Sequence, residues 1–135
     1  MTQMGKLDPG VVKFLRGKYF GKLATTMRDG SPHVTPIWYM LEDRKILINT
    51  TTTRVKYFNI KRDNRICLLV DDGYPYVIVF GRARVAKGRD PRKDIETLAI
   101  RYTGAAAGRK AARERYWKQE RVTIEIIPDR VVYQL

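Results

Sequence analysis

Residues 46–60 read Ile-Leu-Ile-Asn-Thr-Thr-Thr-Thr-Arg-Val-Lys-Tyr-Phe-Asn-Ile: an apolar run, then four threonines, then two cations among apolar residues. The apolar run predicts a strand over Lys45–Thr50, and the residues after the threonines predict a short helix near Val55–Arg62. The first turn of a helix presents unpaired N–H groups and a positive dipole end to an anion. The Arg54 guanidinium adds a two-pronged donor for phosphate. The segment therefore suggests a site for a phosphorylated small molecule.

The same segment also has a purely structural explanation. Threonine is favoured at the ends of strands, and it can cap a helix without binding a ligand. Arg54 and Lys56 would then be ordinary solvated charges on the surface. The segment by itself leaves both explanations open.

Turn signals on the N-terminal side of this segment predict two further strands. They span Tyr19–Met27 and Pro32–Leu41, and a turn with Asp-Gly chemistry at Arg28–Ser31 joins them. A polar turn then leads into Lys45–Thr50. Because these connections are too short for crossovers, we expect the three strands to form an antiparallel meander.

The remaining chain predicts more strands and a helical excursion. Asp8-Pro9 begins a helix that Gly17 can end, and Asp90-Pro91 begins another that Thr103-Gly104 interrupts. Ala105–Lys118 is a second helix or a basic loop. The expected strands are Arg65–Val70, Tyr76–Ala86 with Gly81 as a bulge or a point of close approach, and two final strands that Pro128-Asp129 separates, Arg121–Ile127 and Arg130–Tyr133. This order predicts a mainly β fold with short helices, a small barrel of six to seven antiparallel strands.

The charge balance favours anionic partners. The chain carries 27 Lys and Arg against 14 Asp and Glu, a formal net charge of +13. Residues 82–121 hold 13 basic and 5 acidic side chains, a local excess of +8. Such a field suits a phosphorylated cofactor, an acidic substrate or nucleic acid. A generally charge-rich surface would give the same count.

The sequence offers little catalytic or metal-binding machinery. His33 is the only histidine and Cys67 the only cysteine. Ser31 is two residues from His33 in a predicted turn, which is poor geometry for a nucleophile and its base, and a metal site needs more ligands. We therefore assign no catalytic residue and no metal ligand. If the protein is an enzyme, a bound cofactor would supply the chemistry.

The composition indicates where the protein works. A single cysteine rules out a disulfide framework within one chain, which is typical of the reducing cytoplasm. No apolar run approaches the length of a membrane span, and the N-terminus lacks a signal-peptide pattern. We expect a soluble, cytoplasmic protein with one domain, 1–135, that does not act at a membrane.

The strand around Pro36 has a feature of its own. A proline inside a strand removes a donor from the ladder, so it is confined to edges and bulges. Pro36 therefore leaves a gap where a planar ring could lie against Ile37 and Trp38. A simple edge strand with core aromatic residues explains these residues equally well.

Several segments together resemble a known superfamily. In order and spacing, Leu23–Thr26, Asp29–Trp38, Thr53–Lys56 and Asn59–Ile66 are similar to the pyridoxamine 5'-phosphate oxidase-like proteins, and more narrowly to their flavin and deazaflavin oxidoreductases. The similarity continues through Tyr76–Ala83 and the final segment Ile127–Val131.

This resemblance implies a split β-barrel of the FMN-binding type and a homodimer with cofactor sites across its interface. Arg54 and Lys56 would grip the cofactor phosphate, with Thr50 and Thr53 as hydroxyl donors. The ring would lie near Thr35, Pro36, Ile37 and Trp38. The partner chain would close the site, with Trp117 or Tyr76 as contributors.

The same resemblance implies a cofactor and a reaction. The cofactor would be FMN or the deazaflavin coenzyme F-420, whose acidic tail would suit the +8 segment. A hydride would pass between the cofactor and a small organic substrate. Residues matching the substrate-phosphate site of a true pyridoxamine phosphate oxidase are missing. Two other functions stay open: a cofactor carrier or sensor without turnover, and a basic nucleic-acid-binding barrel that stacks bases on Trp38, Tyr74 and Tyr76.

Overall fold

The computed structural model describes residues 3–5 and 7–135. Within them the helices are α1 Pro9–Leu15, α2 Val55–Arg62, α3 Pro91–Thr103 and α4 Ala105–Glu114, followed by a 3-10 turn, η1 Tyr116–Lys118. The strands are β1 Gln3–Gly5, β2 Gly21–Thr26, β3 Pro32–Ile37, β4 Met40–Glu42, β5 Lys45–Thr51, β6 Arg65–Asp71, β7 Tyr76–Val85 and β8 Arg121–Gln134.

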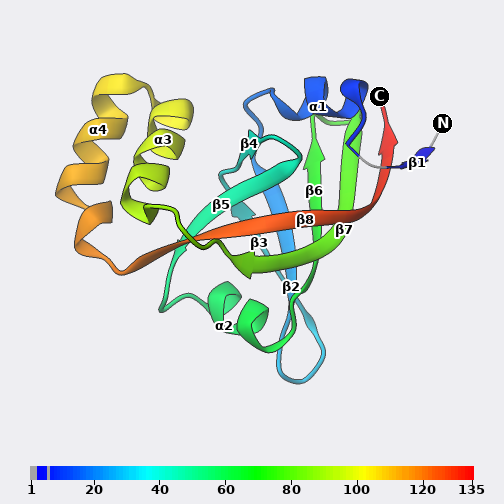
Figure 1. The fold of residues 1–135 in the computed structure, drawn as a ribbon. Coiled ribbons are helices and arrows are strands. Elements are labelled where there is room, and N and C mark those ends of the chain that lie inside the picture. The colour runs from blue at the N-terminus through cyan, green and yellow to red at the C-terminus, as the bar shows by residue number, and fades with distance from the viewer. Residues whose placement is uncertain (1–2, 6) are drawn as a thin grey trace.

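The strands form one eight-stranded antiparallel sheet that curls into an open barrel (Figure 1). Its order is β3-β2-β6-β7-β8-β5-β4, with β1 paired to β8. In the described part of the chain, β3 and β4 stand at the two ends of this order, so the barrel is split between them. The predicted fold class, a mainly β split barrel, is confirmed, with eight strands in place of six to seven.

The predicted meander is wrong, because the chain leaves the sheet at Trp38–Tyr39. The expected strand Pro32–Leu41 is divided into β3, which pairs with β2, and β4, which pairs with β5 at the opposite end of the sheet. Tyr39 is anchored in the core at the break. Its side chain is fully buried, and its hydroxyl donates to the carbonyl oxygen of Leu15 over 2.7 Å.

The two predicted C-terminal strands are one continuous strand, β8. Pro128 does not interrupt it because the proline lies at a bulge: Phe80 of β7 pairs with Arg130 and Gly81 with Pro128, so Asp129 is the extra residue of β8. Gly81 lies opposite Pro128. A Cβ atom at position 81 would collide with the carbonyl oxygen of Ile127, so this close approach requires glycine. The expectation at Gly81, a bulge or a point of close approach, is confirmed.

The helices begin where the capping residues predict. The Asp8 carboxylate accepts from the Val11 N–H over 3.0 Å, and α1 lies across one end of the barrel with Val11 and Leu15 in the core. Asp90 caps α3, which ends at Gly104 with a φ of 100°. The segment Ala105–Lys118, for which the sequence left a helix or a basic loop open, forms α4 and η1.

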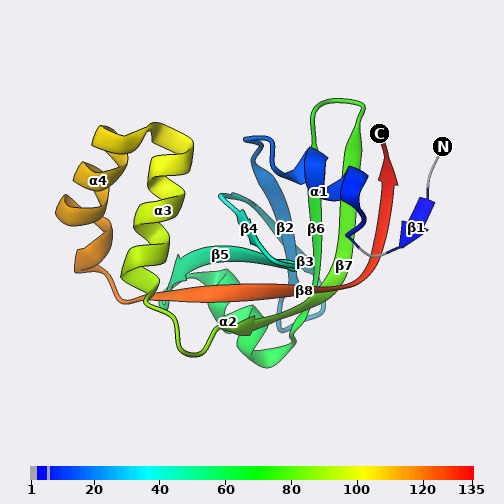
Figure 2. The ribbon, with the colours of Figure 1, turned by 45° about the horizontal axis from the view of Figure 1, so that its top comes forward.

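The helices α3 and α4 form a hairpin at one side of the barrel (Figure 2). The hairpin is inserted between β7 and β8, and α3 buries Ile95, Leu98 and Ala99. This insertion brings the basic stretch of the sequence beside the strand ends. No helix in the described part of the chain is long and apolar enough to cross a membrane.

Candidate functional site

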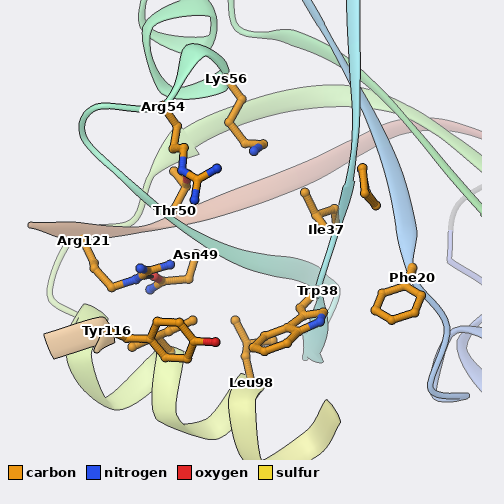
Figure 3. A pocket seen from close by; sticks show the side chains of 12 residues that line it. Phe20, Ile37, Trp38, Asn49, Thr50, Arg54, Lys56, Leu98, Tyr116 and Arg121 are labelled. Carbon is orange, nitrogen blue, oxygen red and sulfur yellow. Dashed lines mark hydrogen bonds between the residues drawn. The ribbon is translucent and has the colours of Figure 1, made fainter. Parts of the chain in front are cut away.

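A pocket of about 300 Å³ lies where the loop between β5 and α2, the end of β3 and the α3–η1 region meet (Figure 3). That volume is at the lower end of the range for small-molecule sites. Twelve residues line it: Phe20, Pro36, Ile37, Trp38, Asn49, Thr50, Arg54, Lys56, Ile95, Leu98, Tyr116 and Arg121.

Two predicted segments that are separate in the sequence meet at this pocket. The end of β3 contributes Pro36, Ile37 and Trp38, and the segment after β5 contributes Thr50, Arg54 and Lys56. Six of the eight predicted site residues therefore share one cavity. At Trp38 the chain leaves the pairing of β2 with β3, and this point borders the pocket.

The other two predicted residues lie outside the pocket lining. The Thr53 hydroxyl lies 3.0 Å from the Thr51 hydroxyl, with which it shares a hydrogen bond. The Thr35 Oγ1 is buried, and it has no hydrogen-bond partner within the described residues. Buried hydroxyls are nearly always paired, so Thr35 is an unsatisfied polar group next to the pocket residue Pro36.

Cations occupy one end of the pocket. Arg54 stands at the N-cap of α2 and Lys56 in its first turn, and both side chains reach toward the cavity. Burial, followed by repulsion from Arg54, lowers the pKa of Lys56. No carboxylate within 3–5 and 7–135 makes a salt bridge with either cation. Two cations at a helix N-terminus without acidic partners fit an anionic group.

Arg121 is a third cation in the pocket, and the sequence analysis missed it. Its Nε donates to Asn49 Oδ1 over 2.7 Å, and its guanidinium lies 5.2 Å from the Tyr116 ring centroid. Burial lowers the pKa of Arg121, and repulsion from Arg54 adds to this effect. Arg121 begins β8 opposite Thr51 of β5, so only the pairing of two distant segments could have revealed it.

Aromatic and aliphatic side chains form the opposite wall. Trp38 stacks on Tyr102 with ring centroids 5.2 Å apart and an interplanar angle of 8°. Phe20 stacks on Tyr102 as well, at 5.7 Å, and Tyr116 meets Trp38 edge-on at 6.3 Å. Leu98 of α3 completes this wall. The pocket therefore has a cationic end and an aromatic end, as a phosphorylated ring compound requires.

The two residues expected to close the site from a partner chain lie outside the pocket of their own chain. Trp117 donates from Nε1 to the Arg92 carbonyl oxygen over 2.9 Å, and its neighbour Tyr116 lines the cavity instead. Tyr76 pairs with Gln134 across β7 and β8. Among the described residues, no group of three or more His, Cys, Asp or Glu is arranged to hold a metal ion.

Known proteins share this fold and part of this sequence. The family described as pyridoxamine 5'-phosphate oxidase matches residues 7–135. A conserved hypothetical protein from Mycobacterium tuberculosis is 26% identical, with a TM-score of 0.76 over 94% of this chain and 84% of that one. A protein described as an F-420 reductase is 28% identical, with a TM-score of 0.69 over 88% of this chain and 93% of that one.

More distant structures support the fold alone. One is a putative pyridoxamine 5'-phosphate oxidase from Listeria innocua, 15% identical, with a TM-score of 0.69 over 95% of this chain and 98% of that one. The family match covers nearly the whole chain, including every strand that borders the pocket. The chain belongs to the pyridoxamine 5'-phosphate oxidase family.

Proposed function

We propose that this protein binds FMN or the deazaflavin coenzyme F-420 and works as an oxidoreductase on a small organic substrate. One observation carries the proposal: one pocket combines Arg54 and Lys56, which have no acidic partner among the described residues, with a stacked aromatic wall. The similarity to a protein described as an F-420 reductase supports the same class of cofactor.

The proposed roles follow the two ends of the pocket. Arg54 and Lys56 hold the phosphate, together with the first N–H groups of α2 and the Thr50 hydroxyl. Pro36, Ile37 and Trp38 offer a flat surface for the ring. Thr35 stays a candidate, because its buried hydroxyl lacks a partner among the described residues. Thr53 stays a candidate hydroxyl donor beside Arg54.

A bound cofactor ring would supply the hydride chemistry in this site. The chain's own residues would bind the phosphate, orient the ring against the end of β3 and exclude water with Trp38, Leu98 and Tyr116. We assign no pocket side chain the role of acid or base, and solvent would serve as the source of any proton. The side chains therefore have binding and orienting roles.

The surroundings of the pocket favour the deazaflavin over FMN. The basic stretch between residues 82 and 121 includes the α3–α4 hairpin and η1, which border the pocket through Ile95, Leu98 and Tyr116. An acidic tail leaving the pocket would meet this positive field. FMN would make the same phosphate contacts, but it has no acidic tail to interact with the basic hairpin.

The test of the proposed function is turnover. Purified protein should bind FMN or F-420 with a change in cofactor fluorescence, and the reduced cofactor should be oxidised when organic acceptors are added. Binding without turnover across a panel of acceptors would indicate a carrier or sensor. Failure to bind either cofactor would contradict the proposed function itself.

The nucleic-acid alternative has less support in the geometry. Trp38, which would have to stack a base, is already stacked on Tyr102 in the pocket wall. Tyr74 and Tyr76, the other two stacking candidates, are not among the pocket residues. Salt separates the two functions, because affinity for nucleic acid falls steeply with salt concentration and affinity for a shaped pocket falls less.

We also propose a cytoplasmic homodimer that completes the site. Large apolar side chains are exposed on the single chain, among them Val34 at 59%, Phe58 at 54% and Val55 at 44%. Val55 and Phe58 belong to α2, which also carries Lys56, so a partner seated there would border the pocket. Light scattering should give about twice the chain mass of 15.7 kDa, and a monomer at all concentrations would contradict this part.

A further inference from the structure

Two side chains hold the Arg121 guanidinium by hydrogen bonds, and its other N–H donors are available to a ligand. Of its five N–H donors, Nε is used by Asn49 Oδ1 at 2.7 Å, and one on Nη1 by the Gln119 side chain. Nη2 has no hydrogen-bond partner within the described residues, and Arg121 lines the pocket. Both partners are neutral amide oxygens, so the positive charge is oriented without being neutralised.

The orientation of the Asn49 amide is determined by its surroundings. Its Nδ2 donates to the carbonyl oxygen of Pro91 over 3.0 Å, and to Thr123 Oγ1 over 3.3 Å. A backbone carbonyl can only accept, and a guanidinium N–H can only donate. Oδ1 must therefore face Arg121. A flipped amide would lose the hydrogen bond to the Pro91 carbonyl oxygen and the one from Arg121 Nε.

Behind Asn49 the contacts continue to a buried ion pair. Thr123 Oγ1 donates to Asp94 Oδ2 over 2.6 Å, and Asp94, which is 6% exposed, also accepts from Arg89 at 2.8 Å and 3.0 Å. Arg89 in turn pairs with Glu42. This chain of contacts ties α3 to the sheet and holds Asn49 at the pocket wall.

We propose that Arg121 is a third cation for the cofactor phosphate and that Asn49 is the positioning residue that aims it. The inference rests on the proposed function and deepens it, because it assigns the phosphate oxyanion a contact beyond Arg54 and Lys56. The phosphate of FMN is a monoester and carries up to two negative charges near pH 7. Arg54 and Lys56 approach the phosphate from the start of α2, and Arg121 would approach it from the start of β8. The phosphate would therefore have cations on more than one side.

The charges of the free protein agree with this role. Arg121 and Lys56 are both partly buried beside Arg54, and no carboxylate of the described residues pairs with them. Like charges held together at a pocket oppose one another until an anion binds between them.

The experiment is a double-mutant cycle on cofactor affinity. The variants are Arg121→Met, Asn49→Leu and both together, with Lys13→Met as a control that removes one exposed charge from α1, away from the pocket and from the basic hairpin. Each is titrated with FMN, with F-420 and with riboflavin, which lacks the phosphate. Loss of one charge-assisted contact predicts a roughly ten- to hundred-fold weaker affinity of Arg121→Met for the phosphorylated ligands. Riboflavin affinity and the Lys13→Met control should stay near wild type.

The positioning role makes a sharper prediction. Asn49→Leu should weaken the phosphorylated ligands in the wild-type background and have no further effect in the Arg121→Met background. Arg121→Lys should be less sensitive to Asn49→Leu than wild type, since the flexible lysine ammonium lacks the planar guanidinium that Asn49 orients. This variant also replaces Arg121→Met if thermal melts show that the latter does not fold.

Two results would overturn the inference while the proposed function stands. One is Arg121→Met binding FMN and F-420 as wild type does; the other is Asn49→Leu weakening them equally with and without Arg121. Wild-type protein that binds neither cofactor would overturn the proposed function and this inference together.

Discussion

Trp38 and Tyr102 stack almost parallel, with ring centroids 5.2 Å apart, and this contact joins the break between β3 and β4 to helix α3. The Tyr102 hydroxyl donates to the Tyr19 carbonyl oxygen over 2.7 Å, and Arg101 Nε donates to the Tyr39 carbonyl oxygen over 3.0 Å. The backbone groups released where the sheet opens are therefore satisfied by α3. The inserted α3–α4 hairpin therefore supports the aromatic wall of the pocket and contacts the backbone where β3 and β4 separate.

Trp38→Leu should weaken FMN and riboflavin by the same factor. The substitution removes an aromatic face worth about 0.5–1.5 kcal/mol beyond its area and leaves the cations in place. Fluorescence titration of both ligands measures the two affinities. Tyr102→Leu should act in the same direction, since Trp38 loses its backing. A loss confined to FMN would place Trp38 at the phosphate end and contradict the assignment.

Lys56→Met should raise the stability of the ligand-free protein at pH 7. The folded-state pKa of Lys56 is lowered by burial and by Arg54, so the charged form opposes folding. Below that lowered pKa the penalty is fully present in the wild type, and it disappears as pH rises toward the ordinary lysine value. Thermal melts across pH should show the advantage of the variant shrinking at alkaline pH. Lys110→Met, on α4, is the control; an equal gain there would remove the explanation.

Tyr39→Phe should destabilise the fold by about 1–3 kcal/mol. The variant leaves the Leu15 carbonyl oxygen without its buried donor, and the lost area is small. Denaturant unfolding at equal protein concentration measures the difference. A change below about 0.5 kcal/mol would mean that the Tyr39 hydroxyl does not secure the break in the sheet.

Gly81→Ala should be strongly destabilising, and Gly10→Ala should not. A Cβ at position 81 would collide with the Ile127 backbone, which cannot move without breaking the β7–β8 pairing. At position 10, in α1, the nearest atom is Asp8 Oδ1 at 3.5 Å, an ordinary contact, and alanine favours a helix by about 0.5–1 kcal/mol. Equal melting temperatures for the two variants would show that the bulge tolerates a side chain.

Local signals predicted the helices and most strands. Asp8-Pro9 and Asp90-Pro91 place the helix starts because capping depends on residues a few positions apart. The segment Val55–Arg62 is helical within its predicted bounds. The sequence also grouped Arg54 and Lys56, which line one pocket, for the same reason: they are close neighbours in the chain.

Long-range pairing was not predictable in this way. The break at Tyr39 depends on a buried contact with Leu15, which the strand pattern around it does not reveal. Pro128 looked like a strand end, yet it fits opposite Gly81 in a continuous β8. Arg121 joins the pocket only through the pairing of β5 with β8, between segments about 70 residues apart.

The central claim is that Arg54 and Lys56 bind the phosphate of a flavin-type cofactor. Its most direct measurement compares FMN with riboflavin on wild-type protein and on the Arg54→Ala, Lys56→Ala double variant. Wild type should bind FMN more tightly than riboflavin, and the variant should lose that preference. The binding free energy for FMN should weaken by roughly 1.5–3 kcal/mol for each lost charge-assisted contact, and the affinity for riboflavin should not change. A double variant that still prefers FMN as strongly as wild type would contradict the claim.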